Sequence, residues 1–116
     1  MNLSGECVLL RVFIGEMDRY QGHPLHEAIV LKAREIGLAG ATVLRGPLGF
    51  GVTSRLHTAK ILRLSEDLPM VVEIVDTQEK IDAFLPTLDA MMDGGLVTTE
   101  KVNVVHYRQD KNGPGK

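Results

Sequence analysis

The sequence predicts an α+β fold of the ferredoxin-like βαββαβ type, in which an antiparallel sheet carries two helices on one face. Segments rich in β-branched residues alternate with two stretches where apolar residues recur every three or four positions. Their order along the chain is strand, helix, strand, strand, helix, strand. The 116 residues are enough for one domain with its own core. We therefore expect a single domain over residues 1–108 and a disordered polar tail at 109–116.

The first half of the chain contains a strand, a helix and a second strand. The first strand is expected over residues 7–14, followed by a polar loop at 16–22. Pro24 suits the first turn of the helix, because its missing N–H has no partner to lose there, and Gly37 is a typical helix stop. The next strand covers residues 41–45. The stripe of the helix that faces the core should consist of Leu25, Ala28, Ile29, Ala33 and Ile36.

A glycine-rich loop separates this half from the next strands. Extended structure resumes at residues 60–64, and the composition of residues 65–69 is typical of a turn. The third strand of the sheet is expected over residues 70–75, where Glu73 stands alone among apolar neighbours.

The second helix and the last strand complete the pattern. Residues 76–79 have the form of a capping box with Asp76 at its start, which marks the beginning of a helix. Pro86 lies inside that helix and predicts a kink or an end near residue 85. Two glycines follow, and the last strand is expected over residues 101–107. The buried stripe of this helix should consist of Ile81, Phe84, Leu85, Leu88 and Met92.

The first strand is apolar on both faces. Alternation places Val8, Leu10, Val12 and Ile14 toward a core and Cys7, Leu9, Arg11 and Phe13 on the opposite face. That second face is too apolar to be left in water. We expect it to be covered by self-association through sheet faces in a closed ring, and the alternative is burial under the glycine-rich loop of the same chain.

Composition and charge exclude several classes of function. A net charge of −2 gives no basic surplus, so nucleic acid is not an expected partner. Cys7 is the single cysteine, which rules out an internal disulfide and favours a reducing compartment. No run of 18 apolar residues occurs, and the N-terminal residues do not resemble a signal peptide. These observations predict a cytoplasmic protein.

Few residues form a pattern typical of catalysis or metal binding. His23 and His26 share a spacing that could hold a metal on one helix face, but a third ligand would have to come from a distant element, and isolated surface histidines are the preferred interpretation. Cys7 begins an apolar strand, where a buried or edge thiol is expected rather than a nucleophile. No hydrolase elbow, Walker loop or paired-carboxylate motif is present. We assign neither catalytic residues nor a metal site.

The glycine-rich loop and Glu73 are the remaining candidates. Glycines between residues 46 and 51 allow backbone N–H groups to face an anion, and Arg45, Arg55 and Lys101 could add positive charge. Glycine loops are also common in hairpins, so this pattern alone leaves both interpretations open. For Glu73, an ion pair with Arg11 or Arg45 is favoured over a catalytic role.

A set of motifs over residues 7–107 resembles the PII signalling proteins, and more closely the PII-like family catalogued as domain of unknown function 190. PII proteins carry G-M-T-V, then G-F-G, then L-P, and this chain carries G-A-T-V, G-F-G and L-P in the same order. The motifs that resemble the PII-like family lie at residues 11–16, 23–25, 40–46, 49–51, 64–69, 73–76 and 95–98.

The resemblance implies a homotrimer whose intersubunit clefts bind an adenine nucleotide, with a T-loop that contacts a target protein. Residues implied at the ligand site are Gly40, Ala41, Thr42 and Val43 beside adenine and ribose, Gly49, Phe50 and Gly51 at the base of the T-loop, and Arg45, Glu73, Gly95 and the phosphate-binding Lys101. Arg55 and His57 would contact the partner.

Two departures from PII proteins narrow these expectations. Where PII proteins carry G-D-G-K, residues 98–101 read T-T-E-K, which removes two glycines and adds Glu100 near the expected phosphate position. This departure argues against a triphosphate with magnesium and favours a less charged ligand such as AMP or ADP, or a cyclic dinucleotide. The candidate effectors are therefore AMP, ADP, ATP and cyclic dinucleotides, and no further cofactor is expected. Residues 52–58 are shorter than the PII T-loop and contain no tyrosine, so uridylylation is not expected.

The function predicted from the sequence is signal transduction without catalysis, by a nucleotide-responsive regulator of a membrane transporter or a cytoplasmic enzyme. One alternative is a small nucleotide hydrolase in which Glu73 or Glu100 orients water. Another is a trimeric metal-binding protein, similar to the copper-tolerance relatives of PII, that uses His23 and His26.

Overall fold

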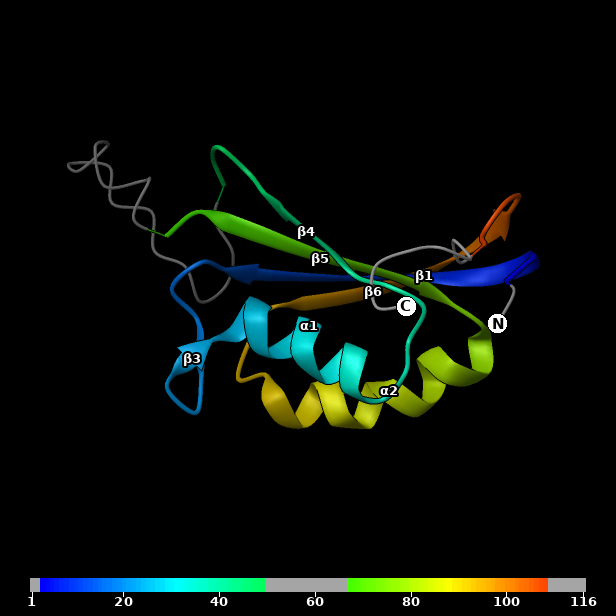
Figure 1. Ribbon diagram of the computed structural model, residues 1–116. Helices are drawn as coiled ribbons and strands as arrows, with labels where there is room; N and C mark the ends of the chain where they lie inside the picture. The colour runs from blue at the N-terminus through cyan, green and yellow to red at the C-terminus, as the bar shows by residue number, and fades with distance from the viewer. Residues whose placement is uncertain (1–2, 50–66, 109–116) are drawn as a thin grey trace.

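The computed structural model describes residues 3–49 and 67–108, in which both helices lie against one face of a four-stranded antiparallel sheet (Figure 1). The order of strands across the sheet is β4-β5-β1-β6. In chain order, the strands of this sheet and the two helices are β1 (Gly5–Gly15), α1 (Leu25–Glu35), β4 (Thr42–Arg45), β5 (Pro69–Asp76), α2 (Gln78–Met91) and β6 (Leu96–Val104). This order and pairing confirm the ferredoxin-like α+β fold.

The core lies between the sheet and the helices, as the alternation of β1 predicted. Val8, Leu10, Val12 and Ile14 are all buried there. From α1 the buried residues are Leu25, Ile29 and Ala33, and from α2 they are Ile81, Phe84, Leu88 and Met91. Burial of each large apolar side chain stabilises the fold by about 1.5–3 kcal/mol, so this layer supplies most of the driving force for folding.

The predicted helix stripes need two corrections at their C-terminal ends. α1 ends at Glu35, and Ile36 is its C-cap, with an exposed side chain rather than a buried one. Gly37 follows with φ +86°, and its N–H donates to the carbonyl of Arg34, which is the arrangement of a glycine helix stop. In α2 the buried methionine is Met91, and the predicted Met92 is only partly buried.

A small hairpin replaces part of the predicted polar loop before α1. β2 (Arg19–Tyr20) pairs with β3 (His23–Pro24) across Gln21 and Gly22, whose φ angles are 51° and 83°. Two central residues with positive φ are typical of a type I′ hairpin turn. Pro24 therefore ends β3 and is the N-cap of α1, instead of lying in the first helical turn.

The capping and length of α2 also differ from the prediction. The N-cap is Thr77, whose hydroxyl accepts a hydrogen bond from the backbone N–H of Lys80 at 3.2 Å, so Asp76 is not the cap. The helix does not end near residue 85 but continues through Pro86 to Met91. It buries apolar side chains on both sides of the proline, and this packing holds the helix together despite one missing backbone hydrogen bond.

The last strand lies earlier in the chain than predicted. β6 covers Leu96–Val104 because it pairs with nearly the whole of β1, from Phe13 opposite Leu96 to Gly5 opposite Val104. Residues 105–107, which were predicted to be strand, have left the sheet. The predicted strand at 60–64, most of the glycine-rich loop and the tail at 109–116 lie outside the described residues.

Candidate functional site

The sheet face opposite the helices, here called the open face, is partly apolar and partly charged. Of the β1 residues predicted for this face, Cys7 is buried, Leu9 and Arg11 are half-buried, and Phe13 is 36% exposed. Phe13 lies in a row across the sheet with exposed Leu44 of β4 and Leu96 of β6. The open face therefore keeps unburied apolar surface within a single protomer.

A groove of about 470 Å³ is hollowed into one end of the open face. It is lined by Leu3, Ala39, Gly40, Ala41, Thr42, Glu73, Val75, Val104, His106 and Tyr107. After β6 the chain crosses toward the opposite edge of the sheet, where the hydroxyl of Tyr107 donates to the backbone carbonyl of Ala39 at 2.9 Å. This hydrogen bond joins two segments that are 68 residues apart and closes one side of the groove.

The fully buried Asp76 fixes another wall of the groove. One oxygen of its carboxylate accepts from the N–H of Ala39 at 2.8 Å, and the other accepts from the N–H of Thr77 at 2.7 Å. Asp76 thus ties the segment before β4 to the start of α2, instead of capping the helix. Sequence reasoning missed this role, for which the only available signal was a carboxylate at the end of an apolar strand.

A line of polar side chains crosses the open face beside the groove. Arg11 donates from Nε to Oε2 of Glu73 at 2.9 Å and from Nη1 to Oε1 of Glu100 at 2.6 Å. Glu73 also stands opposite Thr42 of β4. The hydrogen bond to Glu73 raises the pKa of the Arg11 guanidinium above its ordinary value. The predicted pairing of Glu73 with an arginine is confirmed, and that arginine is Arg11, because Arg45 pairs with Glu16 at 2.5 Å.

The structure brings together four of the predicted ligand residues. Gly40, Ala41, Thr42 and Glu73 all line the groove. Val43, between them in sequence, lies on the other face of β4 and packs against the core.

The other predicted ligand residues lie elsewhere. Arg45 is at the far end of β4, and Gly49 lies beside Pro69 at the start of β5. Gly95 and Lys101 are on the opposite edge of the sheet, where the Lys101 ammonium lies 3.5 Å from Glu6. Phe50, Gly51, Arg55 and His57 are outside the described residues.

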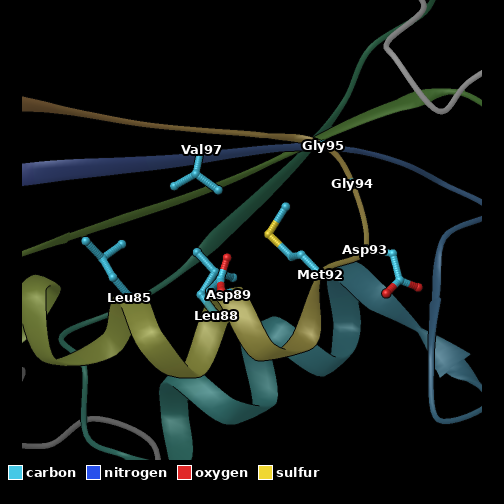
Figure 2. A pocket seen from close by; sticks show the side chains of 8 residues that line it. All are labelled: Leu85, Leu88, Asp89, Met92, Asp93, Gly94, Gly95 and Val97. Carbon is cyan, nitrogen blue, oxygen red and sulfur yellow. The ribbon is translucent and has the colours of Figure 1, made fainter.

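The backbone conformation and close packing at position 95 explain why this residue is a glycine. Its φ is +105°, and a Cβ built there would lie 2.7 Å from the backbone oxygen of Phe13. It borders a second hollow of about 350 Å³, between α2 and β6, where Val97 points toward the helix (Figure 2). This second hollow is lined by Leu85, Leu88, Asp89, Met92, Asp93, Gly94, Gly95 and Val97.

The charge of the groove limits what it can bind. Among its lining residues in the described part of the chain, Glu73 is the only carboxylate, and none is lysine or arginine. A carboxylate accepts hydrogen bonds from hydroxyl or amino groups and repels phosphate, so the groove suits an uncharged ligand portion with donors. In the described ranges 3–49 and 67–108, no group of three or more His, Cys, Asp or Glu side chains is arranged to hold a metal ion. No helix within those ranges has the length and apolar character needed to span a membrane.

Comparisons with known proteins place the chain in a family. The DUF190 family model, described as "Uncharacterized ACR, COG1993", matches residues 7–104. A UPF0166 protein of Aquifex aeolicus is 40% identical over 98 residues, which cover 84% of this chain and 92% of that protein. A UPF0166 protein of Methanocaldococcus jannaschii is 33% identical over 90 residues, which cover 77% of this chain and 82% of that one.

A solved structure shares the fold. CPII, described as a nitrogen regulatory PII-like protein from Thiomonas intermedia, superposes with a TM-score of 0.56 over 87% of this chain and 90% of its own. The sequence identity is 14%, so this likeness concerns the fold alone. The CPII structure is bound to ADP, AMP and bicarbonate.

Proposed function

Because the chain belongs to the DUF190 family, we propose that it is a PII-like regulatory protein that binds an adenine nucleotide and signals to a target protein. One observation carries the proposal. The groove on the open face gathers Gly40, Ala41, Thr42 and Glu73, which are residues that the resemblance to PII-like proteins implies at the ligand site. Adenine nucleotides bound to CPII, which has the same fold, support this choice of ligand.

The chemistry of the groove suits the nucleoside end of such a ligand. Its volume of about 470 Å³ lies in the range of small-molecule sites. Leu3, Val75 and Val104 offer apolar contacts for the base. The carboxylate of Glu73 is a strong acceptor for the two ribose hydroxyls, and the Thr42 hydroxyl stands opposite it.

The phosphates would point out of the groove, away from the carboxylate of Glu73 and toward cations. Arg108 is one such cation in the same protomer, because its guanidinium lies 3.1 Å from Nδ1 of His106, a lining residue. Lys101 lies on the opposite edge strand of the same protomer and next to Glu6. A second copy of the chain can supply this lysine at the cleft between protomers. We therefore propose a homotrimer, whose assembly would also bury exposed Phe13, Leu44 and Leu96.

Signalling would pass through the loop between β4 and β5 to a membrane transporter or a cytoplasmic enzyme. Arg55 and His57 are the proposed partner contacts and rest on the sequence alone. A ligand that binds one loop arrangement better than another shifts their populations, and such coupling is typically about 1–3 kcal/mol.

We propose binding without catalysis. Glu73 and Glu100, the two carboxylates that a hydrolase would use to orient water, are both hydrogen-bonded to Arg11. A hydrolase would need one of these carboxylates beside the phosphates to orient water, whereas the negative charge of Glu73 disfavours phosphate at its position. Absence of phosphate release from ATP and ADP over hours would agree with a pure sensor, and saturable turnover would contradict it.

The experiment that tests the proposal is calorimetric titration with AMP, ADP, ATP and cyclic dinucleotides, with and without magnesium, alongside a mass measurement of the oligomer. We expect saturable binding of about one nucleotide per protomer. Glu73→Gln should weaken binding about 10- to 100-fold, because a hydrogen bond to a charged group is lost. Glu79→Gln, which changes an exposed glutamate on α2, is the matched control and should bind normally. An intact trimer that binds none of these nucleotides would refute the proposal.

A further inference from the structure

We infer that Arg11 is a positioning residue for the ligand, which acts by holding the carboxylate of Glu73 in place to receive the ribose hydroxyls. This inference rests on the proposed nucleotide site. It concerns a residue on β1 that does not line the groove itself.

The register of the sheet places Arg11 where it can do this. Arg11 stands directly opposite Glu73 on β5, and Glu100 on β6 is its diagonal neighbour. Side chains at these positions on one face of antiparallel strands are within reach of one another. The guanidinium donates to Glu73 at 2.9 Å and to Glu100 at 2.6 Å, so it is anchored on both sides by carboxylates from two different strands.

This anchoring leaves half of the Glu73 carboxylate available. Oε2 accepts from Arg11, while Oε1 makes no hydrogen bond or ion pair within residues 3–49 and 67–108. Glutamate side chains are flexible, and ordering one on ligand binding costs free energy. Because the planar guanidinium already holds one oxygen, less of that flexibility remains to be lost when a ligand binds the other.

Glu100 explains how Glu73 remains a good acceptor. An arginine paired with Glu73 alone would cancel its negative charge. Here two carboxylates share one guanidinium, so the three side chains together keep a net charge of −1 beside the groove. That charge strengthens hydrogen bonds from hydroxyl donors and disfavours phosphate at this position, which orients the nucleotide with its phosphates outward.

Stability alone gives a weaker account of these three charges. The side chains of Arg11, Glu73 and Glu100 are 36%, 29% and 56% exposed. Ion pairs with this much solvent access contribute little to the free energy of unfolding. Apolar residues at the same positions would match the row of Phe13, Leu44 and Leu96 beside them, so a role in binding is the better reason for the charges.

The test compares AMP with 2′,3′-dideoxy-AMP, which lacks both ribose hydroxyls, by calorimetric titration of the oligomeric protein. The wild type should prefer AMP by about 10- to 100-fold. In Arg11→Met this preference should shrink toward 1, because AMP affinity falls while dideoxy-AMP affinity stays the same. Arg11→Lys should restore part of the preference, and Glu100→Gln should reduce it in part. Arg34→Gln, on the exposed side of α1, is the matched control and should keep the wild-type preference.

A double variant provides an internal check. Once Glu73→Gln has removed the acceptor, adding Arg11→Met should change AMP affinity no further, because the two residues act through one contact. Additive losses would contradict the inference.

Other outcomes separate this inference from the proposed function. If Arg11→Met weakens both ligands equally, or neither, Arg11 does not position Glu73 and the inference is wrong while the nucleotide site stands. If the wild type binds AMP and dideoxy-AMP equally, the inference is also wrong. If the wild-type protein does not bind AMP, the inference is wrong. If it binds none of the nucleotides in the titration described under the proposed function, the proposed function is wrong as well. If Arg11→Met does not fold, Arg11→Lys and Glu100→Gln decide the question.

Discussion

Substitution of Gly95 by alanine should destabilise the fold strongly, although the resemblance to PII-like proteins implies this glycine at the ligand site. With φ at +105°, an L-residue is strained by about 1–2 kcal/mol. The new Cβ would also lie 2.7 Å from the backbone oxygen of Phe13, 2.9 Å from Met92 and 3.1 Å from Ile14. The backbone oxygen of Phe13 belongs to the paired strand β1, so it cannot shift without disturbing the sheet. Overpacking therefore adds about 1–3 kcal/mol to the loss of stability. We expect a total loss of about 2–5 kcal/mol.

Two other glycines serve as controls that separate these causes. Gly37 has φ +86°, but no atom lies within 4 Å of the place that a Cβ would take, so Gly37→Ala should cost only the backbone strain of about 1–2 kcal/mol. Gly40 has neither a positive φ nor a close neighbour, so Gly40→Ala should leave the free energy of unfolding nearly unchanged.

The assay is urea unfolding followed by circular dichroism at a fixed protomer concentration, because oligomerisation makes apparent stability depend on concentration. For a domain of this size, a loss of about 3 kcal/mol lowers the melting temperature by roughly 10–20 °C. If Gly95→Ala loses no more stability than Gly37→Ala, the contact with Phe13 does not restrict this position. If Gly95→Ala keeps wild-type stability and loses AMP binding instead, Gly95 is a ligand residue and the structural explanation is refuted.

Four further predictions concern the groove and its supports. Asp76→Ala should cost about 2–4 kcal/mol in urea unfolding and also weaken AMP binding, since the partly buried N–H groups of Ala39 and Thr77 lose their acceptor; wild-type stability would contradict this. Thr77→Ala should cost about 1 kcal/mol through loss of the helix cap and leave AMP affinity unchanged, and a drop in affinity would show that the cap also shapes the groove. Tyr107→Phe should change stability by about 0.5–1.5 kcal/mol and speed hydrogen exchange at the N–H of Ala39, and identical exchange would argue against a closed groove. The pKa of Arg11 is higher in the folded protein than in the unfolded chain. The stabilisation that its charge provides is therefore complete below the unfolded pKa of Arg11 and is lost only as the pH rises through the higher folded pKa. The stability difference between wild type and Arg11→Met should therefore stay constant from about pH 6 to about pH 9.

Several elements could be predicted because their signals are local. The alternation of Val8, Leu10, Val12 and Ile14 identified both the strand and its core face, since side chains alternate along any extended chain. The helices followed from apolar spacing, and Gly37 was recognised as a stop because a positive φ there suits glycine. The predicted boundaries were wrong at the ends of elements, because the strand or helix that an element packs against determines where it ends. β6 begins at Leu96 because β1 offers a partner that far. The β-branched residues Val97, Thr98 and Thr99 were a local signal for this strand that the sequence prediction did not use.

For the candidate site too, residues within local motifs could be named from the sequence, whereas contacts between distant segments could not. Gly40, Ala41, Thr42 and Glu73 could be named from motifs, and the pairing of Glu73 with an arginine was expected. Asp76 was misread as a helix cap because its true partner, the N–H of Ala39, lies 37 residues away.

By itself, the sequence determined the βαββαβ order, the core face of β1 and the presence of an apolar second face, because these depend on periodicity along the chain. Only the tertiary structure decided which side chains meet across strands. The line of Thr42, Glu73, Arg11 and Glu100 exists because the register brings together residues that are up to 89 positions apart. The groove likewise requires Tyr107 to reach Ala39 after β6 ends. Such contacts depend on strand order, which local chemistry does not encode.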